Sequence, residues 1–133
     1  MLSAIRGLKR QKGQSMVEFA LIIPVLLLIV IGVIEFGFMF GSYLSLTNAS
    51  REAVRYVSLG GTDAAAETRA KEVAIILVPE RMRVTISPSN TLRNRGDSVS
   101  VDITYDYEFL TPFMNRFLGN SVTLRSKATM RVE

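Results

Sequence analysis

The chain has 133 residues, a formal net charge of +4, and neither cysteine nor histidine. Disulfide bridges, thiol or imidazole catalysis, and zinc sites built from these side chains are therefore excluded, and we expect no enzyme activity, cofactor or small-molecule substrate. Residues 1–13 carry four of the sixteen Lys and Arg residues and none of the twelve acids, which leaves twelve charges of each sign in the remainder. Because a nucleic-acid-binding protein keeps its basic patch on the folded part, we also expect no nucleic-acid partner.

The basic leader, residues 1–13, is followed by a long apolar segment. Glu18 opens this segment, and no residue from Phe19 to Ile34 is charged. At about 1.5 Å per residue, a helix over about residues 19–46 is long enough to cross the ~30 Å hydrocarbon core of a bilayer. The positive leader holds the N-terminus in the cytoplasm by the positive-inside rule. The pattern predicts a single-pass membrane protein whose later residues lie outside the cytoplasm.

Three features within this segment have more than one interpretation. Pro24 predicts a kink or a local loosening, unless it falls near a helix start. Gly37 and Gly41 form a G-x-x-x-G pair, which lets two membrane helices approach closely but also arises by chance. Glu35 is costly in a membrane and is compatible with proton transfer, with a buried contact in a helix bundle, or with a position at the outer interface. Because the span holds no other charged side chain, we favour packing or an interfacial position for Glu35.

The apolar pattern indicates one helix from Ser15 to Ser58, ended by Gly60-Gly61. The stripe that extends it past the bilayer is Leu46, Ala49, Ala53, Tyr56 and Val57. A second helix is predicted from Asp63 to Leu77, with Asp63 as its N-cap and Val78-Pro79 as its end. Its apolar face would comprise Ala66, Ala70, Val73, Ala74 and Leu77.

Three strands follow, each with apolar and polar residues in alternation, which is typical of a sheet with one buried and one wet face. The inward residues would be Met82, Val84 and Ile86, then Val99, Val101, Ile103, Tyr105 and Tyr107, then Val122, Leu124, Ala128, Met130 and Val132. We expect the helices to cover this apolar face. On the wet face, Asp102 and Asp106 should lie beside basic residues of neighbouring strands, an arrangement that we favour over metal ligation. The apolar residues 110–114 and 117–118 either cover the core edge or form a contact patch, and the sequence does not decide between these.

The expected fold class is α+β, with a long N-terminal transmembrane helix that continues into a small extracytoplasmic domain. That domain would hold the second helix and a three-stranded antiparallel sheet, whose strand order the sequence does not indicate. The expected division is a leader at residues 1–13, the long helix at 14–59 and the small domain at 60–133.

Three motifs carry a resemblance to a known family. They are Gly13-Gln14-Ser15-Met16-Val17-Glu18-Phe19-Ala20-Leu21, Ile34-Glu35-Phe36-Gly37 and Ala49-Ser50-Arg51-Glu52-Ala53-Val54-Arg55-Tyr56. Over about residues 11–60 the chain resembles the TadE-like family of minor pilins, or pseudopilins, from tight-adherence type IV pilus systems. The resemblance implies that a prepilin peptidase cuts between Gly13 and Gln14 on the cytoplasmic side. It also implies that Glu18 pairs with the new N-terminal amine of Gln14 when helices bundle, because at low dielectric a paired charge is tolerable and a lone one is not.

The same resemblance implies a location in the bacterial inner membrane, with the N-terminus cytoplasmic and the C-terminal domain periplasmic. It implies a role in pilus assembly that supports surface attachment, and as partners the prepilin peptidase, other pilins, the pilus assembly platform and membrane lipid. Two departures from the pattern of pilins narrow the resemblance. Gln14 stands where better-known type IV pilins have Phe, and the chain is longer than the short major pilins of tight-adherence systems, which favours a minor subunit.

Two alternatives stay open at this point. One is an unprocessed single-pass anchor that presents a small periplasmic binding domain, and the other is a membrane ion or proton component built around Glu35. The sequence also leaves open whether the subunit enters the fibre or stays at its base.

Overall fold

The computed structural model describes residues 2–133, with side chains described from Gly13 onward. The first element, α1 (Leu2–Ser58), is a helix of 57 residues that continues through Pro24. Its predicted end at Ser58 is confirmed, whereas it begins before the expected Ser15. Gly60 turns the chain just after this end with a positive φ of 92°, a conformation that glycine adopts without strain. The chain divides into two compact units, Met1–Phe36 and Gly37–Glu133.

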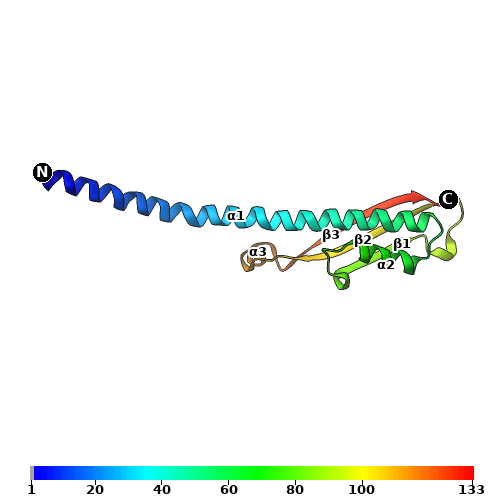
Figure 1. Ribbon diagram of the computed structural model, residues 1–133. Helices are drawn as coiled ribbons and strands as arrows, with labels where there is room; N and C mark the ends of the chain where they lie inside the picture. Colours follow the sequence, from blue (N-terminus) through cyan, green and yellow to red (C-terminus); the bar gives the residue numbers. More distant parts are fainter. Residues whose placement is uncertain (1) are drawn as a thin grey trace. The chain divides into compact units, whose positions relative to one another are not determined.

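The second unit continues after α1 with two helices, two short 3-10 turns and three strands (Figure 1). In chain order these are α2 (Asp63–Val73), η1 (Pro79–Arg81), β1 (Met82–Ser87), η2 (Asn90–Leu92), β2 (Ser98–Glu108), α3 (Pro112–Leu118) and β3 (Ser121–Arg131). The expected α+β class is therefore confirmed.

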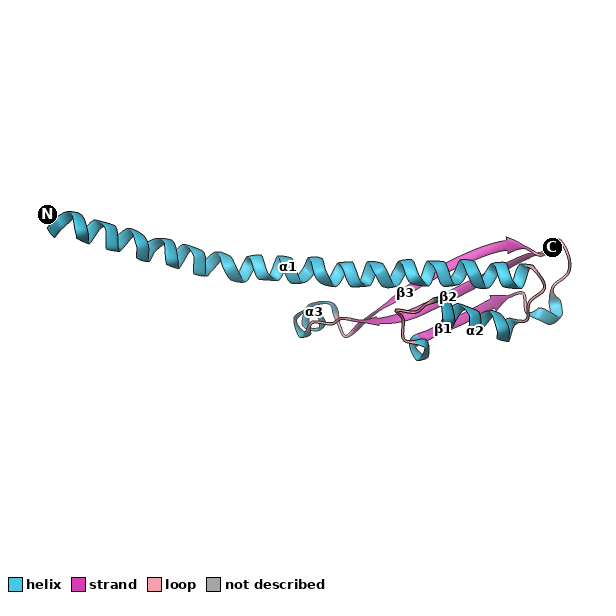
Figure 2. Ribbon diagram, viewed as in Figure 1, coloured by secondary structure: helices cyan, strands magenta, loops and turns pink. Residues whose placement is uncertain are grey.

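The three strands form one antiparallel sheet in the order β1-β2-β3 (Figure 2). In the middle of the sheet, Ile103 of β2 lies opposite Val84 of β1 on one side and Ser126 of β3 on the other. The predicted alternation is clearest in β2, which buries Val99, Val101, Ile103, Tyr105 and Tyr107 on one face. Strands β2 and β3 form a long hairpin that carries α3 at its tip.

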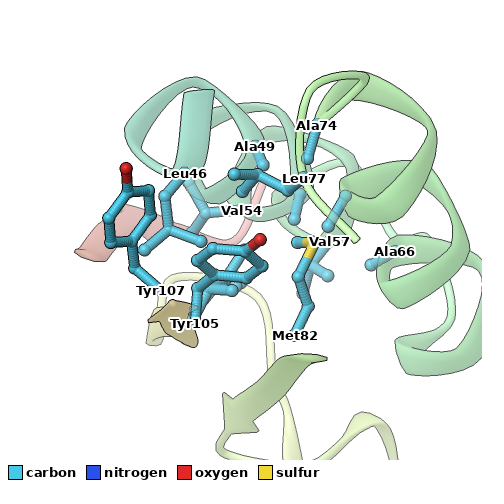
Figure 3. Close-up of a cluster of buried hydrophobic side chains, with 14 of the residues drawn as sticks. Leu46, Ala49, Val54, Val57, Ala66, Ala74, Leu77, Met82, Tyr105 and Tyr107 are labelled. Atoms are coloured by element: carbon cyan, nitrogen blue, oxygen red, sulfur yellow. The ribbon is translucent and has the colours of Figure 1, made fainter. Parts of the chain in front are cut away.

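One hydrophobic core lies between the inward face of the sheet and the helices α1 and α2 (Figure 3). The C-terminal part of α1 contributes Leu46, Ala49, Ala53, Val54 and Val57, and α2 contributes Ala66 and Ala70. The expectation that the helices cover the apolar face of the sheet is confirmed, and the result is a two-layer arrangement. The core therefore fixes residues 46–57 of α1 along the sheet.

Two of the predicted core positions are wrong in detail. Tyr56 is exposed, and Val54 is buried in its place. The Tyr56 ring instead lies against Gly61, where a Cβ would overlap it, so this close approach requires glycine. Met130 is also exposed, and it lines an open cavity together with Arg51 and Arg55.

The N-cap of α2 is Thr62 and not the predicted Asp63. The Thr62 hydroxyl accepts a hydrogen bond of 3.3 Å from the backbone N–H of Ala65, which satisfies one of the free amides at the helix start. Asp63 is engaged elsewhere: it forms an ion pair with Arg93 and accepts a hydrogen bond of 3.0 Å from the backbone N–H of Asn90. Asp63 therefore binds a loop 27 residues further along the chain and does not cap the helix.

Helix α2 also ends earlier than predicted, at Val73 instead of Leu77. Ala74 leaves the helical conformation with ψ at 55°, and a turn follows in which Leu77 donates its backbone N–H to the Ala74 carbonyl at 2.9 Å. This turn returns Leu77 to the core, so Ala74 and Leu77 are buried as predicted. It leaves Ile75 and Ile76 exposed between them.

Arg93 is a buried cation that the sequence analysis did not identify. Besides its ion pair with Asp63, its Nε donates to the Pro88 carbonyl at 3.0 Å and its Nη1 to the Gly61 carbonyl at 3.4 Å. Burial lowers its pKa, because desolvation disfavours the charged form. The guanidinium therefore joins the loop after β1 to the start of α2.

A second polar contact that the sequence analysis missed lies inside the helix–sheet interface. The hydroxyl oxygens of Ser50 on α1 and Ser126 on β3 are 3.0 Å apart, and both residues are buried. Ser50 also donates to the Thr47 carbonyl at 2.9 Å, so the hydroxyls have partners. A buried hydroxyl without a partner costs about 1–3 kcal/mol, so this pair favours one position of α1 along β3.

Candidate functional site

Gly13 lies within α1, and packing gives no reason for a glycine there. A Cβ added at Gly13 would meet no described atom within 4 Å beyond its own helical turn. A glycine inside a helix costs about 0.5–1 kcal/mol relative to alanine, so the residue works against the local structure. No described contact therefore requires glycine at this position.

Gln14 and Glu18 lie one turn apart on the same face of α1. The side-chain amide of Gln14 donates to Glu18 Oε1 at 3.4 Å, and both residues are exposed. Residues four apart on a helix are neighbours. The backbone nitrogen of Gln14 and the carboxylate of Glu18 are therefore separated by one helical turn. No contact in the described chain buries that carboxylate.

The apolar part of α1 after Glu18 is exposed almost all round. Large side chains such as Phe19, Leu21 and Ile29 are each more than half exposed. In the described residues, one helix is long and apolar enough to cross a membrane, within Gly13–Ser58. A helix that is hydrophobic all round needs lipid or other helices as its surroundings.

Glu35 differs from its neighbours because it is buried. Its side chain is 2% exposed, and it has an interaction partner. Neither packing nor proton transfer at Glu35 is tested by this observation, and its role stays a prediction.

Gly37 and Gly41 line a cavity of about 480 Å³ in the second unit. The other lining residues come from α1, the turn after α2, η1 and β2 with the residue that follows it: Phe38, Ser42, Ile76, Val78, Arg81, Tyr105, Tyr107, Glu108 and Leu110. A Cβ at either glycine would meet nothing within 4 Å beyond its own turn. The close approach that G-x-x-x-G permits is therefore not made by another described element of the same chain, and the predicted helix packing stays a prediction for another molecule.

Ile76 and Val78 lie at the same cavity as the glycine pair, a juxtaposition that was not predicted. One feature of the sequence could have indicated an exposed residue here: two consecutive isoleucines, Ile75 and Ile76, directly follow the alanine-rich segment of α2. In extended backbone, consecutive side chains point to opposite faces, so this pair indicates an exposed isoleucine where the helix ends before it, as α2 does at Val73.

The wet face of the sheet carries the expected cross-strand pairs. Arg125 Nε donates to both carboxylate oxygens of Asp102, at 2.9 and 3.0 Å. The hydrogen bond from Arg125 lowers the pKa of Asp102. Asp106 accepts a hydrogen bond of 2.9 Å from the Thr123 hydroxyl and lies 4.0 Å from the Arg83 guanidinium. Both aspartates therefore have strand partners, and within residues 13–133 no three acidic side chains gather as a metal site would need.

Comparison with known proteins gives one family match. Residues 13–55 match the model of the family described as TadE-like protein. The match begins at Gly13, covers the apolar part of α1 and ends within its sheet-packed part, so the sheet lies outside it. Neither the curated proteins nor the solved structures gave a match.

Proposed function

We propose that this chain, which is TadE-like over residues 13–55, is a pilin-related membrane subunit that takes part in assembly of a tight-adherence pilus. The observation that carries the proposal is the position of the match: it begins at Gly13 and continues along an apolar helix that the rest of the chain leaves exposed. Such a helix needs lipid before assembly and other helices after it. The folded domain after it, residues 60–133 in our division, favours a minor subunit.

In this proposal a prepilin peptidase cuts between Gly13 and Gln14 on the cytoplasmic side of the inner membrane, and the domain beyond the span is periplasmic. The glycine is needed because a side chain would obstruct the extended backbone in the protease. Cleavage removes four positive charges and creates an amine at Gln14. Glu18, one turn away on the same face, supplies the opposite charge within the subunit or to a neighbour.

The first test is the mass of the chain in cells. The intact chain should lose its first thirteen residues in cells that have the peptidase and keep them in cells that lack it. Gly13→Val should remain uncleaved in both, because the added side chain blocks the cleavage cleft. Gly7→Val, a matched change elsewhere in the leader, should be cleaved normally. Intact mass spectrometry of the membrane fraction reads all four cases, and an uncleaved native chain in peptidase-positive cells would instead favour an unprocessed anchor.

The second test concerns Glu18. Glu18→Gln should still be cleaved but should lower the number of pili per cell roughly tenfold or more, since tenfold corresponds to only ~1.4 kcal/mol and an unpaired buried charge costs several. Glu72→Gln, which changes an exposed acid on α2, should leave pilus numbers unchanged. Electron microscopy of a deletion strain complemented with each variant gives the count. Equal numbers of pili per cell for both variants would show that assembly does not need Glu18.

A further inference from the structure

The tip of the β2–β3 hairpin carries a group of exposed apolar side chains that no part of the proposed function uses. Four large residues in and around α3 form this group, which we call the tip cluster: Leu110, Phe113, Phe117 and Leu118. Phe117 is 71% exposed and Leu110 64%. Phe113 and Phe117 have ring centroids 4.7 Å apart, so the two aromatic rings lie together. A compact exposed apolar group of this kind marks an interaction surface.

The tip cluster lies at the end of the second unit where α1 enters it. Leu110 lines the same cavity as Gly37 and Phe38, the first residues of α1 in this unit. The opposite end of the unit is defined by the C-terminus, where Glu133 donates its backbone N–H to the Ser58 carbonyl at 3.0 Å. Strand β2 therefore runs back along α1, from the Ser58 end toward Gly37 (Figure 1).

The length of the apolar segment places the bilayer boundary at the same level. A membrane helix needs about 20 residues to cross the hydrocarbon core. Counted from Phe19, twenty residues end at Phe38, short of the residue 46 expected from the sequence, because Leu46 is buried in the core of the domain and cannot face lipid. Phe38 and Leu110 line the same cavity, so the boundary on α1 lies at the end of the domain that carries the tip cluster.

The composition around this level is that of a membrane interface. Phe38, Phe40 and Tyr43 of α1 are exposed there, and aromatic side chains are enriched where a membrane protein leaves the hydrocarbon. On α3, the exposed Arg116 directly precedes Phe117, which pairs a cation with an apolar anchor. The apolar surface of α1 is thus continuous with that of the tip cluster.

We propose that the tip cluster is a second membrane contact, in which Leu110, Phe113, Phe117 and Leu118 enter the leaflet where α1 leaves the bilayer. The occupant of this surface is lipid. The contact would hold the domain at the membrane surface. It rests on the membrane-spanning placement of α1 and on nothing about cleavage, so its failure would leave the peptidase result unaffected.

The absence of cysteine allows a direct test with single labels. Phe117→Cys and Leu92→Cys would each carry an environment-sensitive fluorophore in the full chain, reconstituted at low protein density into phosphatidylcholine–phosphatidylglycerol vesicles with nitroxide-labelled lipids. Leu92 is the matched control: it is 69% exposed and lies in η2, in the loop that Arg93 joins to Gly61 at the other end of the unit. Leu118→Cys gives a second label in the tip cluster.

Labels at 117 and 118 should show blue-shifted emission and strong quenching by the nitroxide lipids, whereas a label at 92 should show neither. Quenching at 117 and 118 no greater than at 92 would overturn the proposal. A blue shift that disappears when the protein is diluted further with lipid would also overturn it, because the tip cluster would then contact another copy of the chain. Quenching that persists unchanged on dilution supports lipid as the occupant.

Discussion

Replacing Ile103 by alanine is expected to lower the free energy of unfolding of the second unit by about 2–5 kcal/mol. Ile103 is fully buried at the centre of the middle strand, with Val84 and Ser126 opposite it on the two neighbouring strands. Alanine there removes apolar contacts and leaves a cavity between sheet and helix that the surroundings fill only in part.

Ile75→Ala is the matched control, since it makes the same chemical change at a side chain that is 86% exposed. It should change the free energy of unfolding by less than about 0.5 kcal/mol. Urea unfolding of the full chain in micelles can be followed by tyrosine signal, because the chain has no tryptophan and Tyr105 and Tyr107 are buried beside Ile103. Similar losses for Ile103→Ala and Ile75→Ala would contradict the placement of the core.

Arg93→Met is expected to lower the free energy of unfolding by about 1.5–3 kcal/mol, the range for hydrogen bonds to charged groups. Arg93 is 5% exposed at its side chain, and it joins Asp63 to the carbonyls of Pro88 and Gly61. Methionine fills much of the same volume but donates no hydrogen bond, so the two carbonyls lose a donor. The loss stays below that of a fully buried ion pair because Asp63 is 34% exposed and can be hydrated.

Arg95→Met provides the comparison for Arg93, two residues away in the same loop and exposed. It should be close to neutral in the same urea measurement. Proteolysis should separate the two variants further, because loss of the Arg93 contacts frees the loop from the start of α2. If Arg95→Met were as destabilising as Arg93→Met, the buried ion pair would not be the source of the effect.

Much of the fold was predictable because local pattern and tertiary environment agree. In β2 every second residue is apolar, and one side of the strand is buried by helices, so period-2 alternation was sufficient to define the strand. The same alternation failed at Ser126, which takes an inward position among apolar neighbours because Ser50 of α1 supplies its hydrogen bond. That contact joins residues 76 apart in sequence, so the local pattern could not predict it.

The cap of α2 illustrates a second limit of sequence reasoning. Thr62 and Asp63 are adjacent and both are good N-caps, so the local sequence does not choose between them. The choice is made by Arg93, whose buried guanidinium attracts the carboxylate and leaves the hydroxyl to cap the helix. The choice therefore depends on a distant charge, and predicting it requires the loop to be placed first.

The candidate site likewise has residues that the sequence could identify and features that it could not place. Gly13 and Glu18 could be identified because each contradicts its surroundings: one is a glycine in a helix, and the other is a charge at the edge of an apolar run. The cavity beside Gly37 and the tip cluster could not be placed, because both depend on β2 running back along α1 to bring Leu110 to the same cavity as Phe38. The sequence left the apolar connection between β2 and β3 open as core edge or contact patch, and its exposure favours the patch.

The antiparallel course of β2 along α1 also determines how the domain would carry mechanical load. A pull on α1 from the Gly37 end acts along the sheet-packed stretch from Leu46 to Val57, so all its core contacts are strained together in shear. A pull across that direction would instead peel them apart in sequence, starting at one end. Resistance to forced unfolding follows the unfolding rate under load. A load shared by all contacts at once lowers the unfolding barrier less than a load that each contact bears in turn. The second unit should therefore resist a pull best along the axis of α1.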